Sequence, residues 1–138
     1  MIYGATRLTC FALISALEED MRGALMEHGA LANVEAFLSS ERYERAKSRR
    51  AKDHGPQDSS TLNSLLPYLD FADSYELLMK LKGSLPASLV GALERIKSHA
   101  ARLVEIRNRV AHTRPMEIDD LPFVLDFSED IARGSLSD

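Results

Sequence analysis

The sequence predicts an all-α fold, and two observations support that prediction. Helix-forming Ala, Leu, Glu and Arg are abundant, whereas Val, Ile and Thr are sparse and never alternate with polar residues over a strand-length run. Several stretches repeat their apolar residues every three or four positions, which is the period of a helix. We therefore expect a helical bundle of about five helices.

The first three helices are expected to be bounded by glycine and proline. The first covers about residues 3–28 and stops at Gly29, and its apolar stripe contains Leu8, Phe11, Ile14, Ser15, Leu17, Met21 and Leu25. The second covers about residues 31–52 and ends before Gly55-Pro56, which leads into a polar loop. Pro67 then separates a short apolar turn from a third helix over about residues 70–81, which Asp70 and Asp73 begin.

Two further helices follow. The longest is expected over about residues 86–113, because Pro86 suits a first helical turn and Pro115 forbids continuation. The last covers about residues 118–133 and buries Phe123, Val124 and Phe127, after which the GSLSD segment is expected to fray.

Length and composition limit the class of protein. At 138 residues the chain is expected to form one domain over residues 1–138, with its core over about 8–130, and the sequence leaves open whether it belongs to a longer protein. The net charge of −4 argues against a protein that coats nucleic acid, although it allows a local basic patch. A single cysteine excludes an intrachain disulfide, and the apolar segment 8–17 is too short to span a membrane, so we expect a cytoplasmic protein.

The longest expected helix carries an arginine within its apolar seam. Its seam positions are spaced alternately three and four residues apart, namely Leu89, Leu93, Ile96, Ala100, Leu103, Arg107, Val110 and Arg114. An arginine at such a position must either extend toward solvent or hold an anionic group.

Arg107, Asn108 and His112 form a plausible catalytic set near the end of this helix. Asn108 and His112 are four residues apart and share a face, whereas Arg107 and His112 are about 140° apart on an ideal helix. They can converge only at a bent helix end or between two chains. The alternative is a solvated helix terminus, where cations and polar groups are common.

The three residue types suit phosphodiester chemistry without a metal or cofactor. A histidine exchanges protons near neutral pH, an arginine presents a planar fork to phosphate oxygens, and an asparagine can orient either partner. No carboxylate cluster or second histidine lies close in sequence, so we expect no metal site. The RNA 2′-hydroxyl could attack its own phosphate while His112 moves protons and Arg107 stabilises the developing charge.

The segment RNRVAH followed by TRP resembles the signature of the HEPN superfamily of small all-α domains, in which four to six residues separate an Arg from a His and Asn commonly follows the Arg directly. The segments SALEEDMRGALMEHG and LPYLDFADSYELLMKL are most similar to the branch that includes the HEPN domain of a eukaryotic RNA-surveillance endonuclease. The resemblance covers about residues 8–130, and only RNxxxH is specific. In this chain we expect the motif near the C-terminal end of the longest helix.

This resemblance implies RNA as substrate and a shared site in a homodimer. Many HEPN proteins are metal-independent endoribonucleases of toxin–antitoxin, phage-defence and RNA-processing systems, in which two motif-bearing helices pack together. By position, Arg107, Asn108 and His112 become the catalytic candidates, and the Leu89–Val110 helix becomes the dimer contact. An antitoxin or regulatory partner is also implied, but Arg114 stands where tyrosine-modified toxins carry the tyrosine, which argues against that control.

Several other arginines are candidate RNA contacts, each with a structural alternative. Arg42, Arg45, Arg49 and Lys52 form a basic stripe, which is either a solvated face or a track for the RNA backbone. Arg109 either contacts RNA or pairs with Glu105 one turn earlier. Arg102 and Arg114 either flank the cleft or lie on the surface.

Three functions therefore remain open at the level of sequence. The first is a metal-independent endoribonuclease. The second is a non-catalytic HEPN module that dimerises or senses a ligand for a larger defence or signalling protein. The third is a plain helical interaction domain in which the motif is a coincidence.

Overall fold

The computed structural model describes residues 2–29, 33–55 and 61–137. Within these ranges, side chains are described for residues 4 to 131. These residues form eight α-helices and two short 3-10 turns, and no strand occurs among them. The all-α prediction is therefore confirmed. Contacts divide the chain into two compact units, residues 1–19 with 86–138 and residues 20–85.

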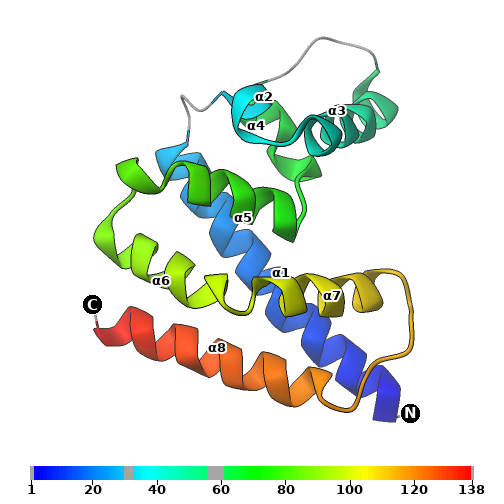
Figure 1. Ribbon diagram of the computed structural model, residues 1–138. Coiled ribbons are helices and arrows are strands. Elements are labelled where there is room, and N and C mark those ends of the chain that lie inside the picture. Colours follow the sequence, from blue (N-terminus) through cyan, green and yellow to red (C-terminus); the bar gives the residue numbers. More distant parts are fainter. Residues whose placement is uncertain (1, 30–32, 56–60, 138) are drawn as a thin grey trace. The chain divides into compact units, whose positions relative to one another are not determined.

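The first unit contains the N-terminal part of α1 and three further helices (Figure 1): α1 (Ile2–His28), α6 (Ala87–Lys97), α7 (Ala100–Ala111) and α8 (Asp120–Ser137). α6 and α8 lie side by side. One core cluster consists of Cys10, Ile14, Ile106 and Val124, which Leu13, Leu121 and Phe123 partly cover. α8 buries Val124 and Phe127 as expected, and the helix continues to Ser137, within the segment expected to fray, whose last residue lies outside the described residues.

The buried stripe of α1 differs from the expected one. Cys10 is completely buried and Ile14 is 4% exposed, whereas Leu8 and Phe11 are 68% and 55% exposed. The core-facing stripe of this unit therefore passes through Cys10, and two large apolar side chains of the expected stripe face solvent.

The expected longest helix is divided into α6 and α7 at Ser98 and His99. The His99 N–H bonds to the carbonyl of Ile96 at 2.9 Å, which tightens the chain into a turn. His99 Nδ1 lies 3.0 Å from Ser98 Oγ, and the ring packs 5.5 Å from the ring centroids of both Phe123 and Phe127. The prediction of a single helix over 86–113 is wrong because these side-chain contacts favour a turn.

The second unit contains the C-terminal part of α1 and the remaining elements: α2 (Val34–Phe37), α3 (Ser40–His54), α4 (Leu62–Leu65), η1 (Leu66–Tyr68), α5 (Phe71–Lys80) and η2 (Lys82–Ser84). α2 packs against α5, and α3 packs against α4 and η1. Leu25, Leu65, Leu77 and Leu78 are completely buried in this unit.

The expected second helix is also divided, because Ser39 starts a new helix. Ser39 Oγ accepts a hydrogen bond from the Arg42 N–H, and the Ser39 N–H donates to Glu76. Leu38 is extended and buried just before this cap. The expected start at Leu31 lies outside the described residues.

The expected third helix is confirmed as α5. Asp70 accepts from the Asp73 N–H at 2.9 Å, and Asp73 accepts from the Asp70 N–H at 3.1 Å, which is a reciprocal capping box. Both aspartates therefore begin the helix, as predicted. The larger number of helices than expected comes from the two divided helices and the short α4.

Candidate functional site

The motif residues occupy the last turns of α7. This helix ends at Ala111, and His112 is its C-cap, with its N–H still bonded to the carbonyl of Asn108 at 3.0 Å. Thr113 follows with a φ of 54°, so the chain turns sharply after His112. α7 has 12 residues whereas α1 has 27, so the expectation that the motif lies on the longest helix is wrong.

Arg107 lies at the edge of the buried face of α7. Leu103 and Ile106 are buried, whereas the Arg107 side chain is 29% exposed. The core therefore continues from Leu103 through Ile106, and Arg107 lies beside the core without interrupting it. Of the two expectations for this arginine, it holds an anionic group, and that group is Glu18.

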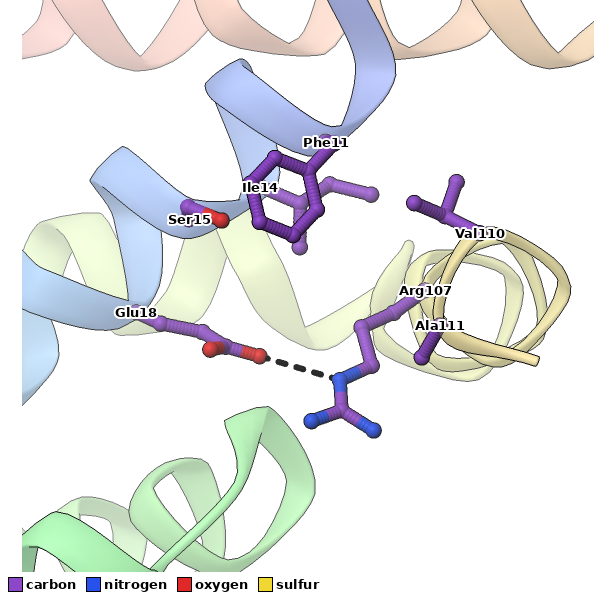
Figure 2. A pocket seen from close by; sticks show the side chains of 7 residues that line it. All are labelled: Phe11, Ile14, Ser15, Glu18, Arg107, Val110 and Ala111. Atoms are coloured by element: carbon purple, nitrogen blue, oxygen red, sulfur yellow. Dashed lines mark hydrogen bonds and ion pairs between the residues drawn. The ribbon is translucent and has the colours of Figure 1, made fainter. Parts of the chain in front are cut away.

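Arg107 and Glu18 share a small cavity in the first unit. Arg107 Nε donates to Glu18 Oε1 at 3.2 Å, and the Glu18 side chain is only 13% exposed. Figure 2 shows Arg107 reaching from α7 and Glu18 from α1. The cavity has a volume of about 70 Å³, and its walls are mainly apolar: Phe11, Ile14, Ser15, Val110 and Ala111 accompany the ion pair.

The structure does not bring Asn108 and His112 into this cavity. Neither residue lines it. The His112 side chain is exposed, and its imidazole makes no hydrogen bond to the described part of the chain. Because the His112 N–H keeps its helical hydrogen bond, the wide separation of Arg107 and His112 around the helix persists within one chain.

Arg109 is held inside the first unit by Asp120. Arg109 Nε and Nη2 donate to the two carboxylate oxygens of Asp120 at 3.0 and 2.5 Å. Asp120 is completely buried and also accepts from the Glu117 N–H at 2.9 Å. The hydrogen bond to Asp120 raises the pKa of Arg109, and Glu105 adds only the effect of a nearby charge. Arg109 thus pairs with Asp120 in place of the expected ion pair with Glu105.

Arg7 is a further contact at the end of α7. Its Nη1 donates to the carbonyl of Arg109 at 2.8 Å, and its Nη2 donates to the carbonyl of Arg114. These carbonyls lie on either side of His112 in the sequence, so Arg7 holds the turn that contains the histidine. The Arg109 carbonyl also accepts from the Arg114 N–H at 2.9 Å, so this turn is closed by a backbone hydrogen bond as well as by Arg7.

The remaining candidates of the first unit are on the surface. Arg114 is exposed. Arg102 is also exposed, and its guanidinium lies 4.3 Å from the ring centroid of Phe123, a cation–π contact.

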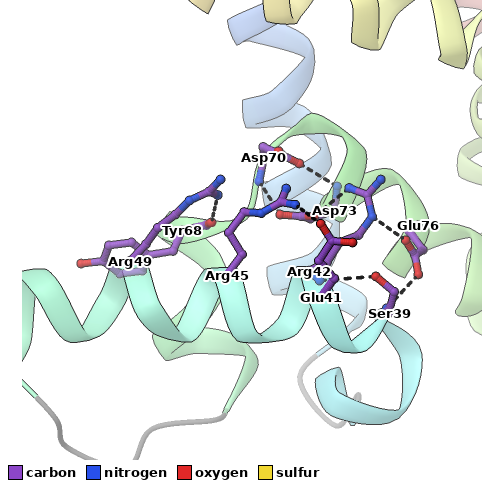
Figure 3. A network of polar contacts seen from close by, with 9 residues as sticks. All are labelled: Ser39, Glu41, Arg42, Arg45, Arg49, Tyr68, Asp70, Asp73 and Glu76. Carbon is purple, nitrogen blue, oxygen red and sulfur yellow. Dashed lines mark hydrogen bonds and ion pairs between the residues drawn. The ribbon is translucent and has the colours of Figure 1, made fainter.

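The basic stripe of α3 belongs to the second unit, and its three arginines contact the chain's own acceptors (Figure 3). Arg42 binds Asp73 at 2.9 Å and Glu76 at 3.1 Å. Arg49 donates to the carbonyl of Tyr68 at 2.9 Å, and Arg45 pairs with Glu41 at 2.8 Å. Much of the basic charge expected for a solvated face or an RNA track is therefore engaged within the unit.

Burial and hydrogen bonding oppose each other at the Arg42–Asp73 pair. Asp73 is 1% exposed, and this burial raises the pKa of its carboxyl, although hydrogen bonds from Arg42 and the Asp70 N–H act in the opposite direction. Burial lowers the pKa of Arg42, but the hydrogen bond to Asp73 and the nearby charges of Asp73, Glu76 and Asp70 outweigh it, so the pKa is raised. The pair connects α3 to α5.

Glu18 and Arg7 are the residues that sequence reasoning missed. Glu18 lies four residues after Ile14 and seven after Phe11, so it shares a face with apolar positions. This is the same anomaly that identified Arg107, a charged residue at helical spacing from apolar residues. The signal for Glu18 was present, but its partner is 89 positions away.

No family model, curated protein or solved structure matches this chain. Among the described residues, no helix combines the length and the apolar character that a membrane crossing requires. The same residues contain no group of three or more His, Cys, Asp or Glu side chains arranged to hold a metal ion.

Proposed function

We propose that this chain is a metal-independent endoribonuclease of HEPN type, in which two chains build one active site. The proposal combines the RNxxxH resemblance with one observation: Arg107 lies in a cavity whose rim continues into an exposed apolar face. The fold class agrees with the proposal, because HEPN domains are all-α.

The charge and exposure of the motif residues suit binding of a phosphodiester. Arg107 is partly exposed, and only its Nε is engaged by Glu18, which leaves Nη1 and Nη2 as donors for phosphate oxygens. His112 is exposed on a turn that Arg7 holds, so an RNA chain can reach its imidazole.

A second chain could supply the His112 that the Arg107 of the first chain cannot reach within its own helix. Leu8, Phe11 and Val110 line an open hollow of about 350 Å³, and Phe11 and Val110 also line the Arg107 cavity. Exposed apolar surface of this kind favours association, and a two-fold dimer places the same patch on both partners. Packing the C-terminal part of α7 and the adjoining part of α1 against their copies would set the His112 of one chain beside the Arg107 of the other.

The proposed reaction is an internal transesterification. The 2′-hydroxyl oxygen attacks the adjacent phosphorus while a His112 imidazole takes its proton, and the bond from phosphorus to the 5′-oxygen breaks. The leaving oxygen receives a proton from an imidazolium. Arg107 stabilises the charge that develops on the non-bridging oxygens. The products carry a 2′,3′-cyclic phosphate and a 5′-hydroxyl.

Cleavage of single-stranded RNA in EDTA tests the proposal. Wild-type protein should cleave and leave 2′,3′-cyclic phosphate ends, whereas Arg107→Ala and His112→Ala should lose at least about 100-fold in rate. His54→Ala, which removes an exposed histidine of the second unit, is the matched control and should cleave normally. Equal background cleavage by wild type and His112→Ala would overturn the proposal.

A non-catalytic HEPN module is the second candidate. It is favoured by the ion pair with Glu18, which already neutralises Arg107 within the chain. Such a module predicts a dimer in solution whose preparations show no cleavage that depends on His112. A strictly monomeric protein at micromolar concentration would contradict both candidates.

A further inference from the structure

We propose that Glu18 is a positioning residue for Arg107, which it holds through Nε so that Nη1 and Nη2 are presented to a phosphate. This inference rests on the proposed function. It adds a carboxylate from α1 to a site that the motif places entirely on α7, and it states how that carboxylate acts.

The geometry of the contact favours positioning over masking. The ion pair joins Glu18 to Arg107 through Nε at 3.2 Å. In Figure 2 the two terminal nitrogens project past the ion pair, on the far side of the guanidinium from Phe11 and Val110. A carboxylate that masked the arginine would cover this terminal edge, which is the edge that binds phosphate in a two-pronged manner.

The surroundings make the contact selective for arginine. Glu18 is 13% exposed beside apolar cavity walls, so water competes weakly for its oxygen. Holding Nε fixes the plane of the guanidinium, and the terminal nitrogens then keep a defined direction. Lysine has one terminal ammonium and no second nitrogen, so it cannot be held and bind phosphate in the same way.

Positioning and masking predict opposite effects of removing the carboxylate. If Glu18 positions Arg107, Glu18→Leu should lower kcat at least about ten-fold, because small displacements of a catalytic group are costly. Binding of non-cleavable 2′-O-methyl RNA should not weaken, because a negative charge has been removed. If Glu18 masks Arg107, the same variant should cleave faster than wild type.

Two variants control for charge and for folding. Glu18→Gln retains an oxygen that can accept from Nε, so it should keep kcat within about three-fold of wild type. Glu19→Gln makes the same charge change at an adjacent exposed position and should leave kcat and KM unchanged. Circular dichroism of each variant shows whether it is folded.

An NMR readout makes the test independent of cleavage. The Nε–H of Arg107, assigned by its loss in Arg107→Lys, should give a protected signal in wild type and Glu18→Gln and none in Glu18→Leu. It should persist when 2′-O-methyl RNA binds. Three outcomes would overturn the inference and leave the proposed function standing. They are loss of this signal when RNA binds, an unchanged kcat in Glu18→Leu, and faster cleavage by Glu18→Leu. A persistent signal in a protein that binds RNA and never cleaves it would support the inference and overturn the proposed function.

Discussion

Asp120 binds Arg109 through both carboxylate oxygens, at 3.0 and 2.5 Å, with Asp120 completely buried. The pair joins the beginning of α8 to the end of α7, one turn before the candidate histidine. Removing one partner of such a pair leaves an uncompensated buried charge, which is much more costly than removing both.

Asp120→Ala should therefore lower the free energy of unfolding by about 3–5 kcal/mol, measured by urea denaturation. The double variant Asp120→Leu with Arg109→Met should recover most of that loss, because it removes both charges. If the double variant is no more stable than Asp120→Ala alone, the pair does not act as a buried unit.

Gly29 and Gly23 provide a matched pair of substitutions. A Cβ at Gly29 would lie 2.8 Å from the carbonyl oxygen of Leu25 and 3.0 Å from a methyl of Leu62. Gly29→Ala should therefore cost about 1–3 kcal/mol of stability. A Cβ at Gly23, within α1, meets nothing within 4 Å, so Gly23→Ala should stabilise by about 0.5–1 kcal/mol. Thermal unfolding of both variants checks the two signs, and a stabilised Gly29→Ala would contradict the close approach.

Because Cys10 is buried, we expect the protein to lose stability at alkaline pH. Burial, and secondarily the charge of Asp120, raises the pKa of the Cys10 thiol above its usual value of 9.0. Above that value the unfolded chain loses a proton that the folded chain keeps, so stability falls as the pH rises. This contribution to stability is fully present below about pH 9 and is lost as the pH rises above it. Cys10→Ala lacks the thiol, so its free energy of unfolding should depend less on pH above about pH 9.

The same burial should make Cys10 unreactive in the folded protein. A thiol reagent at pH 7–8 should label it only at the rate of unfolding, because the side chain is 0% exposed. Rapid labelling without denaturant would show that α1 opens from the core.

Because the Asp73 carboxyl is buried, we expect a second dependence of stability on pH. Its pKa is raised mainly by burial, so the folded chain holds this proton at pH values where the unfolded chain has released it. Stability therefore falls as the pH rises above about 4, and Asp73→Asn, which also loses the ion pair with Arg42, should reduce that dependence over the acidic pH range above about 4. Unfolding in urea across this range measures it, and an unchanged dependence would contradict the assignment.

Local sequence signals predicted the helical class, the helix start at Asp70 and Asp73, and the end of α7 before Pro115. They did not predict the turns at Ser39 and His99, because helical periodicity continues through both. These turns depend on contacts with distant residues, Glu76 in one case and Phe123 and Phe127 in the other. Tertiary contacts of this kind override local propensity.

The candidate site shows the same division. Arg107 was identifiable because a charge at an apolar register is anomalous within a single helix. Its partner Glu18 was not, because pairing α1 with α7 requires the fold of the first unit. The ion pair of Arg109 with Asp120 was not predicted for a different reason, because Glu105, four residues before Arg109 in the same helix, was the simpler partner to expect.

Complementation between two inactive chains tests most directly the proposal that two chains share one site. Arg107→Ala and His112→Ala proteins, each inactive alone, should regain RNA cleavage when they are unfolded together and refolded as a mixture. Each mixed dimer would hold one intact pair, an Arg107 from one chain and a His112 from the other. Random pairing makes about half of the dimers mixed, and each mixed dimer holds one of the two Arg107–His112 pairs of a wild-type dimer, so about one quarter of wild-type activity is expected. A mixture no more active than either variant alone, beside an active wild type, would contradict a site built from two chains.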